Sequence, residues 1–279
     1  MYLDARDGTR LYFKDWGNGP PMVLIHGWPL SSDMWEYQAP ILANQGQRVV
    51  AYDRRGFGRS VQPYTGYDYD TLADDLAAVL EQLNLTNVTL VGFSMGGGEV
   101  ARYLSRHGSD RIARAVLLSA VTPFMLKTDD NPDGVDASVF QEMLENLAED
   151  RPAFLATFGY KFFGTSTLDF SVSSEMMEWA KMLALQASPH ATMACVGAFA
   201  ETDFRRDMAA FNVPTLIIHG EADETVPIAG AGRAAARMIP HAQLVVYADA
   251  PHALFITQKD RLTNDLLDFV GARGRMQRA

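Results

Sequence analysis

One serine in the chain is placed where it could act as a nucleophile. Ser94 lies between two glycines in Gly92-Phe93-Ser94-Met95-Gly96, after an apolar run and before a helical pattern. A tight strand-to-helix turn of this kind strains the backbone at the serine and faces its hydroxyl toward free N–H groups of the helix. A glycine-rich turn in which the serine is only a helix N-cap is the alternative interpretation.

A serine hydroxyl is a weak nucleophile until a base removes its proton, and a histidine is the expected base. His252, in the stretch DAPHALF, follows the serine in chain order and comes from the loop after the last predicted strand. We therefore predict that His252 is the base. The remaining histidines are interpreted as ordinary polar residues: His26, His107, His190, His219 and His241.

A carboxylate is expected between the serine and the histidine, to orient the imidazole and stabilise its charged form. The stretch HGEADETVP supplies Asp223 at the end of a predicted strand, with Glu221 and Glu224 as competitors. Asp249 is interpreted as a turn former, since it lies only three residues before His252. The order Ser94, Asp223, His252 is the chain order of the α/β-hydrolase triad.

These residues need parallel strands to bring them together, and the sequence has the matching pattern. Short apolar runs that suit strands buried on both faces occur at Pro20–Gly27, Gln47–Asp53, Asn87–Ser94, Ile112–Ala120, Val213–Gly220 and Ala242–Asp249. Helical patterns lie between or after them, at Thr71–Leu83, Gly97–His107 and Thr263–Ala272. The alternation predicts an α/β fold with a mostly parallel central sheet flanked by helices.

One region breaks this alternation. From residue 122 to residue 212 there is no strand run, only helical patterns after the loop TDDNPDG. We interpret residues 122–212 as a helical cap, or lid, inserted into a core made of residues 1–121 and 213–279.

Composition and charge exclude several classes of function. The net charge of −10 disfavours nucleic acid as a partner, and the arginines of the C-terminal tail, Arg273, Arg275 and Arg278, are interpreted as a solvated terminus. The single cysteine, Cys195, allows no intrachain disulfide and no cysteine-rich metal site, and is expected to be a buried free thiol. Neither an apolar signal core nor a run of ~18 apolar residues is present, so we expect a soluble, cytoplasmic protein with no membrane partner.

Over nearly its whole length the chain resembles the α/β-hydrolase group that contains cofactor-free haloperoxidases (perhydrolases), bacterial aryl esterases and γ-lactamases. The resemblance is carried by VLIHGWP, AYDRRGFGRS, VGFSMGGGEVARY, HGEADETVP and YADAPHALF. It implies Ser94 as nucleophile, His252 as base and Asp223 as acid. It also implies an oxyanion hole made by the backbone N–H groups of Trp28 and Met95. No metal or other cofactor is expected.

We expect a small apolar pocket, with candidate lining residues from the oxyanion loop, the cap and the acid loop; for each residue alone, a place in the ordinary core is the alternative interpretation. These candidates are Trp28, Pro29, Val121, Phe124, Phe158, Phe162, Phe199 and Val226. The stretch DRRGFGRS is interpreted as a structural turn. Haloalkane dehalogenases and most epoxide hydrolases of this fold carry an aspartate at the position that Ser94 occupies in the strand-to-helix turn. The serine here disfavours their alkyl-enzyme mechanism.

The predicted activity is cleavage of aryl or short-chain carboxylic esters through an acyl-enzyme, released by water or, giving a peroxyacid, by hydrogen peroxide. In the group it resembles, a proline at Pro29 accompanies perhydrolysis. A lactonase, a γ-lactamase or a carbon–carbon bond hydrolase would use the same triad, and a non-catalytic ligand receptor is a rival from another class. The expected partners are small ester or carboxylic acid substrates, with water or hydrogen peroxide. Members of the group that the chain resembles are often homo-oligomers, and a homo-oligomer is expected here on that analogy alone.

Overall fold

The computed structural model describes residues 1–166 and 172–272; the three tail arginines lie outside these ranges. Its eight-stranded sheet has the order β1-β2-β4-β3-β5-β6-β7-β8. The strands are β1 Tyr2–Asp4, β2 Arg10–Trp16, β3 Pro21–Ile25, β4 Arg48–Tyr52, β5 Val88–Phe93, β6 Ile112–Leu118, β7 Thr215–Gly220 and β8 Gln243–Tyr247. Strands β3 to β8 pair in parallel, and β1 and β2 form an antiparallel edge. The predicted α/β-hydrolase fold is confirmed.

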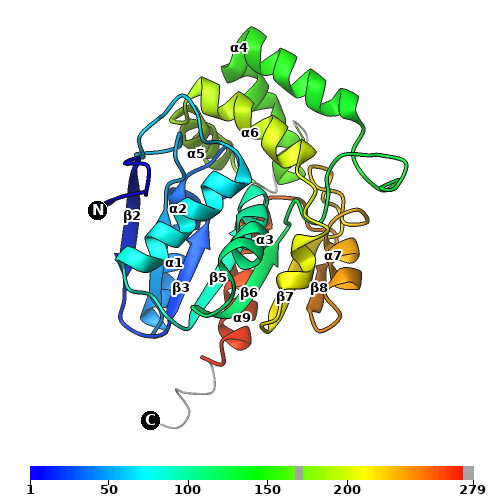
Figure 1. Ribbon diagram of the computed structural model, residues 1–279. Coiled ribbons are helices and arrows are strands. Elements are labelled where there is room, and N and C mark those ends of the chain that lie inside the picture. The colour runs from blue at the N-terminus through cyan, green and yellow to red at the C-terminus, as the bar shows by residue number, and fades with distance from the viewer. Residues whose placement is uncertain (167–171, 273–279) are drawn as a thin grey trace.

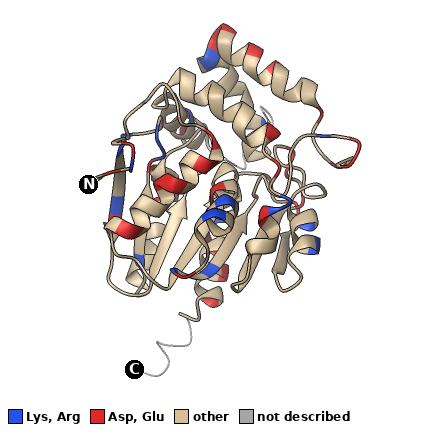
Figure 2. Cartoon of the chain, in the orientation of Figure 1, with Lys and Arg blue, Asp and Glu red and all other residues tan. Residues whose placement is uncertain are grey.

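Helices cover both faces of the sheet, and each face carries its own apolar core (Figure 1). One core lies under α2 (Tyr69–Gln82), α3 (Met95–His107) and α7 (Gly232–Met238). The other lies under α1 (Ala39–Asn44), α8 (Leu254–Thr257) and α9 (Lys259–Phe269). Two 3₁₀ helices, η1 Ser32–Trp35 and η2 Asp207–Ala210, join these elements. Strands β3, β5 and β7 contain no Lys, Arg, Asp or Glu, and most charged side chains lie on the helices and loops around the sheet (Figure 2).

The described residues between β6 and β7 form a loop followed by helices, and these helices lie over one end of the sheet (Figure 1). It contains α4 (Ala137–Phe163), α5 (Ser174–Leu185) and α6 (Pro189–Glu201). Helix α4 is kinked where Asp150 leaves the helical conformation (φ −150°, ψ 83°) two residues before Pro152, which cannot donate a backbone hydrogen bond. The Asp150 side chain accepts from the N–H of Ala153 at 3.0 Å, so the second half of α4 starts with its own cap.

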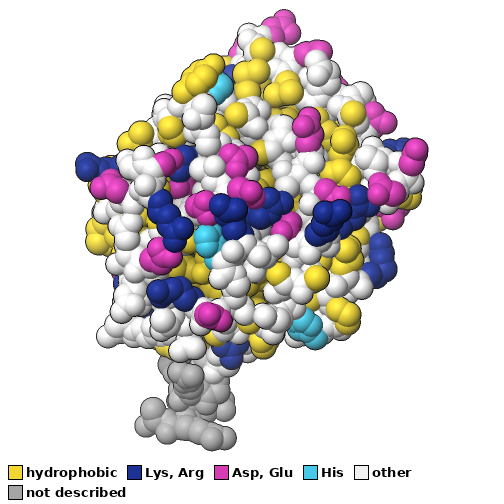
Figure 3. Space-filling view, in the orientation of Figure 1, with side chains coloured by type: hydrophobic (Ala, Val, Ile, Leu, Met, Phe, Trp, Pro, Cys, Tyr) yellow, Lys and Arg dark blue, Asp and Glu magenta, His cyan; other side chains and the backbone are white. Residues whose placement is uncertain are grey.

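Basic and acidic side chains are interleaved on the face that carries α2 and α3 (Figure 3). Arg102 pairs with Asp70 and Asp207, and Arg106 pairs with Asp74. These ion pairs balance the basic side chains between the two helices. Within the described ranges, no helix is long and apolar enough to cross a membrane.

Candidate active site

The turn between β5 and α3 holds Ser94 in a strained backbone conformation. Its φ is +54° and its ψ is −119°, a region that side-chain-bearing residues rarely adopt. The turn is so tight that a Cβ on Gly92 would lie 2.4 Å from the carbonyl oxygen of Gly96, so only glycine fits there. The Ser94 side chain makes no capping hydrogen bond to α3. Its hydroxyl is therefore used elsewhere, and the N-cap alternative does not account for it.

The Ser94 hydroxyl points to His252, which in turn contacts Asp223. The distance from Ser94 Oγ to His252 Nε2 is 2.9 Å, and that from His252 Nδ1 to Asp223 Oδ2 is 2.6 Å. An ionised carboxylate can only accept, so we assign the imidazole proton to Nδ1. Nε2 is then free to accept from the serine hydroxyl. All three side chains are buried, with exposed fractions of 6%, 1% and 5% for Ser94, His252 and Asp223.

Asp223 accepts from three donors and lies beside a second histidine. Its Oδ1 accepts from the backbone N–H groups of Thr225 at 2.9 Å and Val226 at 2.8 Å. Its Oδ2 faces His252 and lies 3.4 Å from Nε2 of His219. Burial alone would raise the pKa of Asp223, but His252 and His219 outweigh that effect and hold the pKa well below its ordinary value of 3.8. The carboxyl group is therefore ionised at neutral pH.

The other acidic candidates lie in different surroundings. Glu221 is exposed and pairs with Arg233 at 3.3 Å, and Glu224 is exposed. Asp249 has a φ of +55°, as expected of a turn former.

The remaining histidines bind structural partners. His107 lies 2.8 Å from a carboxylate oxygen of Asp74, and His190 stacks on Tyr64. His241 contacts the carbonyl of Val213, His219 the carbonyl of Val226 and His26 the carbonyl of Gly27.

Two backbone N–H groups near Ser94 in the sequence or in the cavity lining have no hydrogen-bond acceptor among the residues that the structure describes. They belong to Trp28 and Met95, the two predicted oxyanion donors. Met95 is the first residue of α3, so the partial positive charge of the helix N-terminus adds to its N–H. The carbonyl oxygen in the same peptide unit, that of Ser94, accepts from the N–H groups of Gly97 at 3.0 Å and Val121 at 3.2 Å. Because the peptide is planar, these two bonds also fix the direction of the Met95 N–H.

A mostly apolar cavity of about 240 Å³ opens onto Ser94 and His252. Five predicted lining residues contribute to it: Trp28, Val121, Phe158, Phe199 and Val226. The cavity is also lined by three residues that were not predicted, Met125, Phe140 and Met143. Phe140 and Met143 are three residues apart on α4, a spacing that could have revealed them. Two exposed charged residues, Lys161 and Glu224, are part of the same lining.

Three other predicted pocket residues lie outside this cavity. Pro29 and Phe162 line a second cavity of about 150 Å³, and the Phe162 ring packs 5.2 Å from the His252 ring. Phe124 is buried beneath the guanidinium of Arg205, 5.2 Å from its ring centroid. The Trp28–Pro29 peptide bond is cis.

Cys195 is a buried free thiol on α6. Burial raises its pKa to about 12, so no thiolate forms at neutral pH. No group of three or more histidine, cysteine or acidic side chains that could hold a metal ion occurs in the described part of the chain.

Comparison with known proteins gives consistent matches. The sequence model of the α/β hydrolase fold family matches residues 20–259. A non-heme chloroperoxidase of Kitasatospora aureofaciens is 42% identical, with 95% of this chain and 98% of that protein covered. A bifunctional esterase/perhydrolase of Acinetobacter calcoaceticus is 39% identical, with 96% and 99% covered. The crystal structure of a bromoperoxidase from Bacillus anthracis superposes with a TM-score of 0.93 at 45% identity, covering 97% of this chain and all of the other.

Proposed function

This chain belongs to the α/β hydrolase fold family, and from that membership we propose that Ser94, His252 and Asp223 are its catalytic triad. The protein is an enzyme, a serine ester hydrolase with perhydrolase activity. The observation that carries the residue assignment is the position of His252, whose two ring nitrogens lie 2.9 Å from Ser94 Oγ and 2.6 Å from Asp223 Oδ2.

In the first half of the reaction, Ser94 Oγ attacks the carbonyl carbon of the ester while His252 Nε2 takes its proton. Asp223 stabilises the imidazolium that forms. The negative charge that develops on the carbonyl oxygen is stabilised by the N–H groups of Trp28 and Met95, and such donors each contribute about 3–4 kcal/mol. The C–O bond to the leaving group then breaks, and His252 returns the proton to the departing oxygen. The product is an acyl-enzyme on Ser94 and a free alcohol or phenol.

In the second half, His252 takes a proton from water or from hydrogen peroxide, and the remaining oxygen attacks the acyl-enzyme. Water releases a carboxylic acid and restores Ser94. Hydrogen peroxide releases a peroxyacid in the same way. The peroxyacid can then oxidise chloride or bromide to the hypohalous acid, while it is itself reduced to the carboxylic acid. Haloperoxidase activity therefore arises in solution from a hydrolase.

The cavity favours small or aryl esters. Its volume of about 240 Å³ and its aromatic walls suit an acyl group of a few carbons or a single ring. Side chains from α4 and α6, including Phe140, Phe158 and Phe199, form much of the wall. We therefore propose that residues 122–212 act as the cap that sets the acyl-group preference.

The proposal is tested with p-nitrophenyl acetate and a fluorophosphonate probe. We expect turnover of the ester and a single covalent adduct on Ser94. Ser94→Ala and His252→Ala should each abolish turnover, and the double variant should be no worse than either single one, because the pair acts as a unit. Adding hydrogen peroxide should produce peracetic acid. An adduct on another residue, or His252→Ala with most of its activity, would contradict the assignment.

A further inference from the structure

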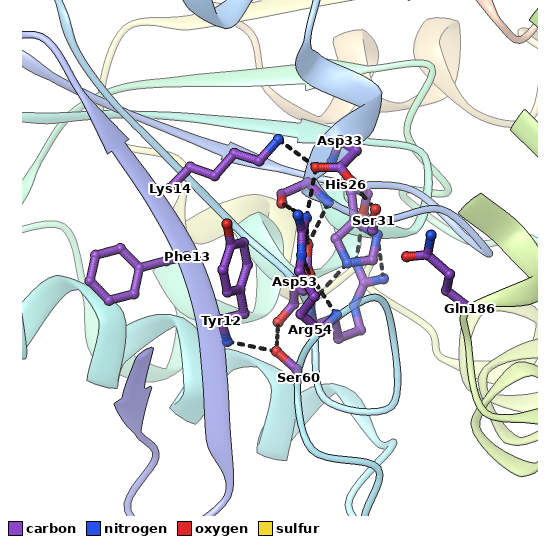
Figure 4. Close-up of polar contacts among 12 residues, drawn as sticks. Tyr12, Phe13, Lys14, His26, Ser31, Asp33, Asp53, Arg54, Ser60 and Gln186 are labelled. Atoms are coloured by element: carbon purple, nitrogen blue, oxygen red, sulfur yellow. Dashed lines mark hydrogen bonds and ion pairs between the residues drawn. The ribbon is translucent and has the colours of Figure 1, made fainter. Parts of the chain in front are cut away.

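The turn after β4, Asp53–Ser60 (DRRGFGRS), contacts the loop that carries Trp28 (Figure 4). Asp53 Oδ1 accepts from the backbone N–H of Ser32 at 2.8 Å, at the far end of that loop. At its near end, the guanidinium of Arg54 donates from Nη2 to the carbonyl of His26 at 2.7 Å. The backbone N–H of Arg54 also donates to the His26 ring at Nε2, 2.9 Å away. The turn thus holds the loop on both sides of Trp28.

The contact to His26 determines the direction of the Trp28 N–H. Since Nε2 of His26 accepts from Arg54, the ring proton is on Nδ1, and Nδ1 donates to the carbonyl of Gly27 at 2.9 Å. That carbonyl also accepts from the N–H of Leu30 at 3.0 Å. The Gly27 carbonyl and the Trp28 N–H belong to one planar trans peptide unit and point in opposite directions. Fixing the carbonyl therefore fixes the oxyanion donor.

Arg54 is in turn bound to the helix that carries the second donor. Its Nε donates to Glu99 Oε1 at 2.5 Å, and its Nη2 forms an ion pair with the same carboxylate. Glu99 lies in α3, four residues after Met95, and its other oxygen accepts from the hydroxyl of Tyr52 at 2.5 Å. Arg54 and Glu99 are almost fully buried, at 1% and 0% exposure. The ion pair therefore joins the Trp28 loop to the Met95 helix in the interior.

We propose that Arg54 and Glu99 are positioning residues for the oxyanion hole, which set the distance and direction of the Trp28 N–H relative to the Met95 N–H. This inference rests on the proposed roles of Trp28 and Met95. Stability alone does not explain the arrangement, because apolar residues of similar volume are often as stabilising as a buried ion pair. Arg54 also makes contacts to His26 that its pairing with Glu99 does not require.

The chain offers a matched control. Arg55, next to Arg54 in the turn, forms a second buried ion pair with Asp75, with both donor distances at 2.6 Å. Its other partner is Asp7, and its hydrogen bonds reach no atom of the Trp28 loop. The two pairs are alike in chemistry and burial, at 2% exposure for Arg55 and for Asp75, and differ in whether they touch the oxyanion loop.

The experiment compares two double variants, Arg54→Met/Glu99→Gln and Arg55→Met/Asp75→Asn. Removing both charges avoids the uncompensated buried charge that a single change would leave. For the first variant we expect kcat on p-nitrophenyl acetate to fall about 10- to 100-fold, with KM within about twofold. Loss of a whole oxyanion donor costs about 10²- to 10³-fold, and here the donor stays but is poorly aimed. Affinity for a boronic acid transition-state analogue should fall by the same factor, and the pH dependence of kcat should keep its shape, since His252 is untouched.

The control variant should keep kcat and boronic acid affinity within about threefold of the wild type. Equal losses in the two variants, or wild-type values in the first, would overturn the inference. If the first variant does not fold, Arg54→Lys is the decisive variant. Lysine keeps the positive charge, but its single ammonium group cannot donate to Glu99 and to the His26 carbonyl in the geometry of the planar guanidinium. It should then lower kcat and not KM, and an unchanged kcat would overturn the inference. Failure of the proposed function would look different from failure of this inference, because the wild type itself would then neither hydrolyse the ester nor be labelled at Ser94.

Discussion

Replacing Asp223 by asparagine tests the triad by changing one atom type at almost constant volume. The side-chain amide of the new asparagine can lie in two orientations, which exchange its oxygen and its NH₂ group. If its oxygen faces the N–H groups of Thr225 and Val226, as Oδ1 does now, its NH₂ group faces Nδ1 of His252. Nδ1 must then accept, so the imidazole proton moves to Nε2, which can no longer take a proton from Ser94.

The flipped orientation is too costly to rescue the site. It would place the NH₂ group against the backbone N–H groups of Val226, which is buried, and Thr225, which is part-buried, and each unpaired donor costs about 1–3 kcal/mol. The unproductive orientation is thus favoured by about 2–6 kcal/mol. A fall of about 10⁴-fold in kcat, the precedent for this change in other triads, equals about 5.4 kcal/mol and lies within that range. We therefore expect kcat to fall by about 10³- to 10⁴-fold.

The measurement is kcat for p-nitrophenyl acetate, together with the rate of fluorophosphonate labelling at Ser94, which should fall in parallel. Glu221→Gln is the matched control, because it changes a neighbouring carboxylate that is exposed and pairs only with Arg233 among the described residues. It should leave both rates within about twofold. If Asp223→Asn kept more than about a tenth of the activity, His252 would not depend on this carboxylate and the reasoning would be refuted.

The remaining predictions concern stability, the thiol and the oxyanion loop. The pKa of Asp223 is lowered in the folded protein, so the ionised carboxylate stabilises the fold at neutral pH, and this contribution is lost progressively as the pH falls below about 4. Urea titrations should therefore show a larger difference in unfolding free energy between the wild type and Asp223→Asn at pH 7 than at pH 3. Iodoacetamide should leave esterase activity unchanged, because the pKa of Cys195 is about 12 and the thiol is buried; stoichiometric inactivation with label on Cys195 would contradict this. Pro29→Leu restores a backbone N–H and frees φ, and should lower the ratio of perhydrolysis to hydrolysis of one acetate ester at fixed peroxide while hydrolysis persists; an unchanged ratio would mean that Pro29 only shapes the loop.

Buried elements were the most predictable part of the fold. Each of the six predicted strands contains an observed one, because continuous apolar runs have few alternatives to a doubly covered parallel sheet. The antiparallel edge, β1 and β2, was missed. Strand β2 is exposed on one side and shows only a short alternation, with Leu11 and Phe13 inward. A strand that is buried on only one face gives a weaker pattern than one that is buried on both faces.

The candidate triad could be read from chain order and strand ends, because parallel strands bring their carboxyl ends to a single edge. Side-chain direction within a loop could not be read in this way. Phe124, Phe158 and Phe162 look alike in the sequence, yet only Phe158 lines the cavity at Ser94. The backbone path from the end of β6 to the end of α4 decides which ring turns inward, and that path depends on features such as the kink at Asp150.

The three histidines at strand ends show why a residue type and its place are not enough to identify a base. In His26 both ring nitrogens bind the backbone, at Arg54 N–H and the Gly27 carbonyl, and burial followed by the charge of Arg54 lowers its pKa well below 6.5. In His219, Nε2 donates its proton to the carbonyl of Val226, so this nitrogen cannot accept a proton from a substrate or a hydroxyl. Of the three, only His252 contacts a carboxylate through Nδ1 and a hydroxyl through Nε2. A general base needs both partners at once, because the first fixes the tautomer and stabilises the charge, and the second supplies the proton. Those partners come from Asp223 and Ser94, which are 29 and 158 residues away in the chain, so the distinction arises only when the sheet has assembled.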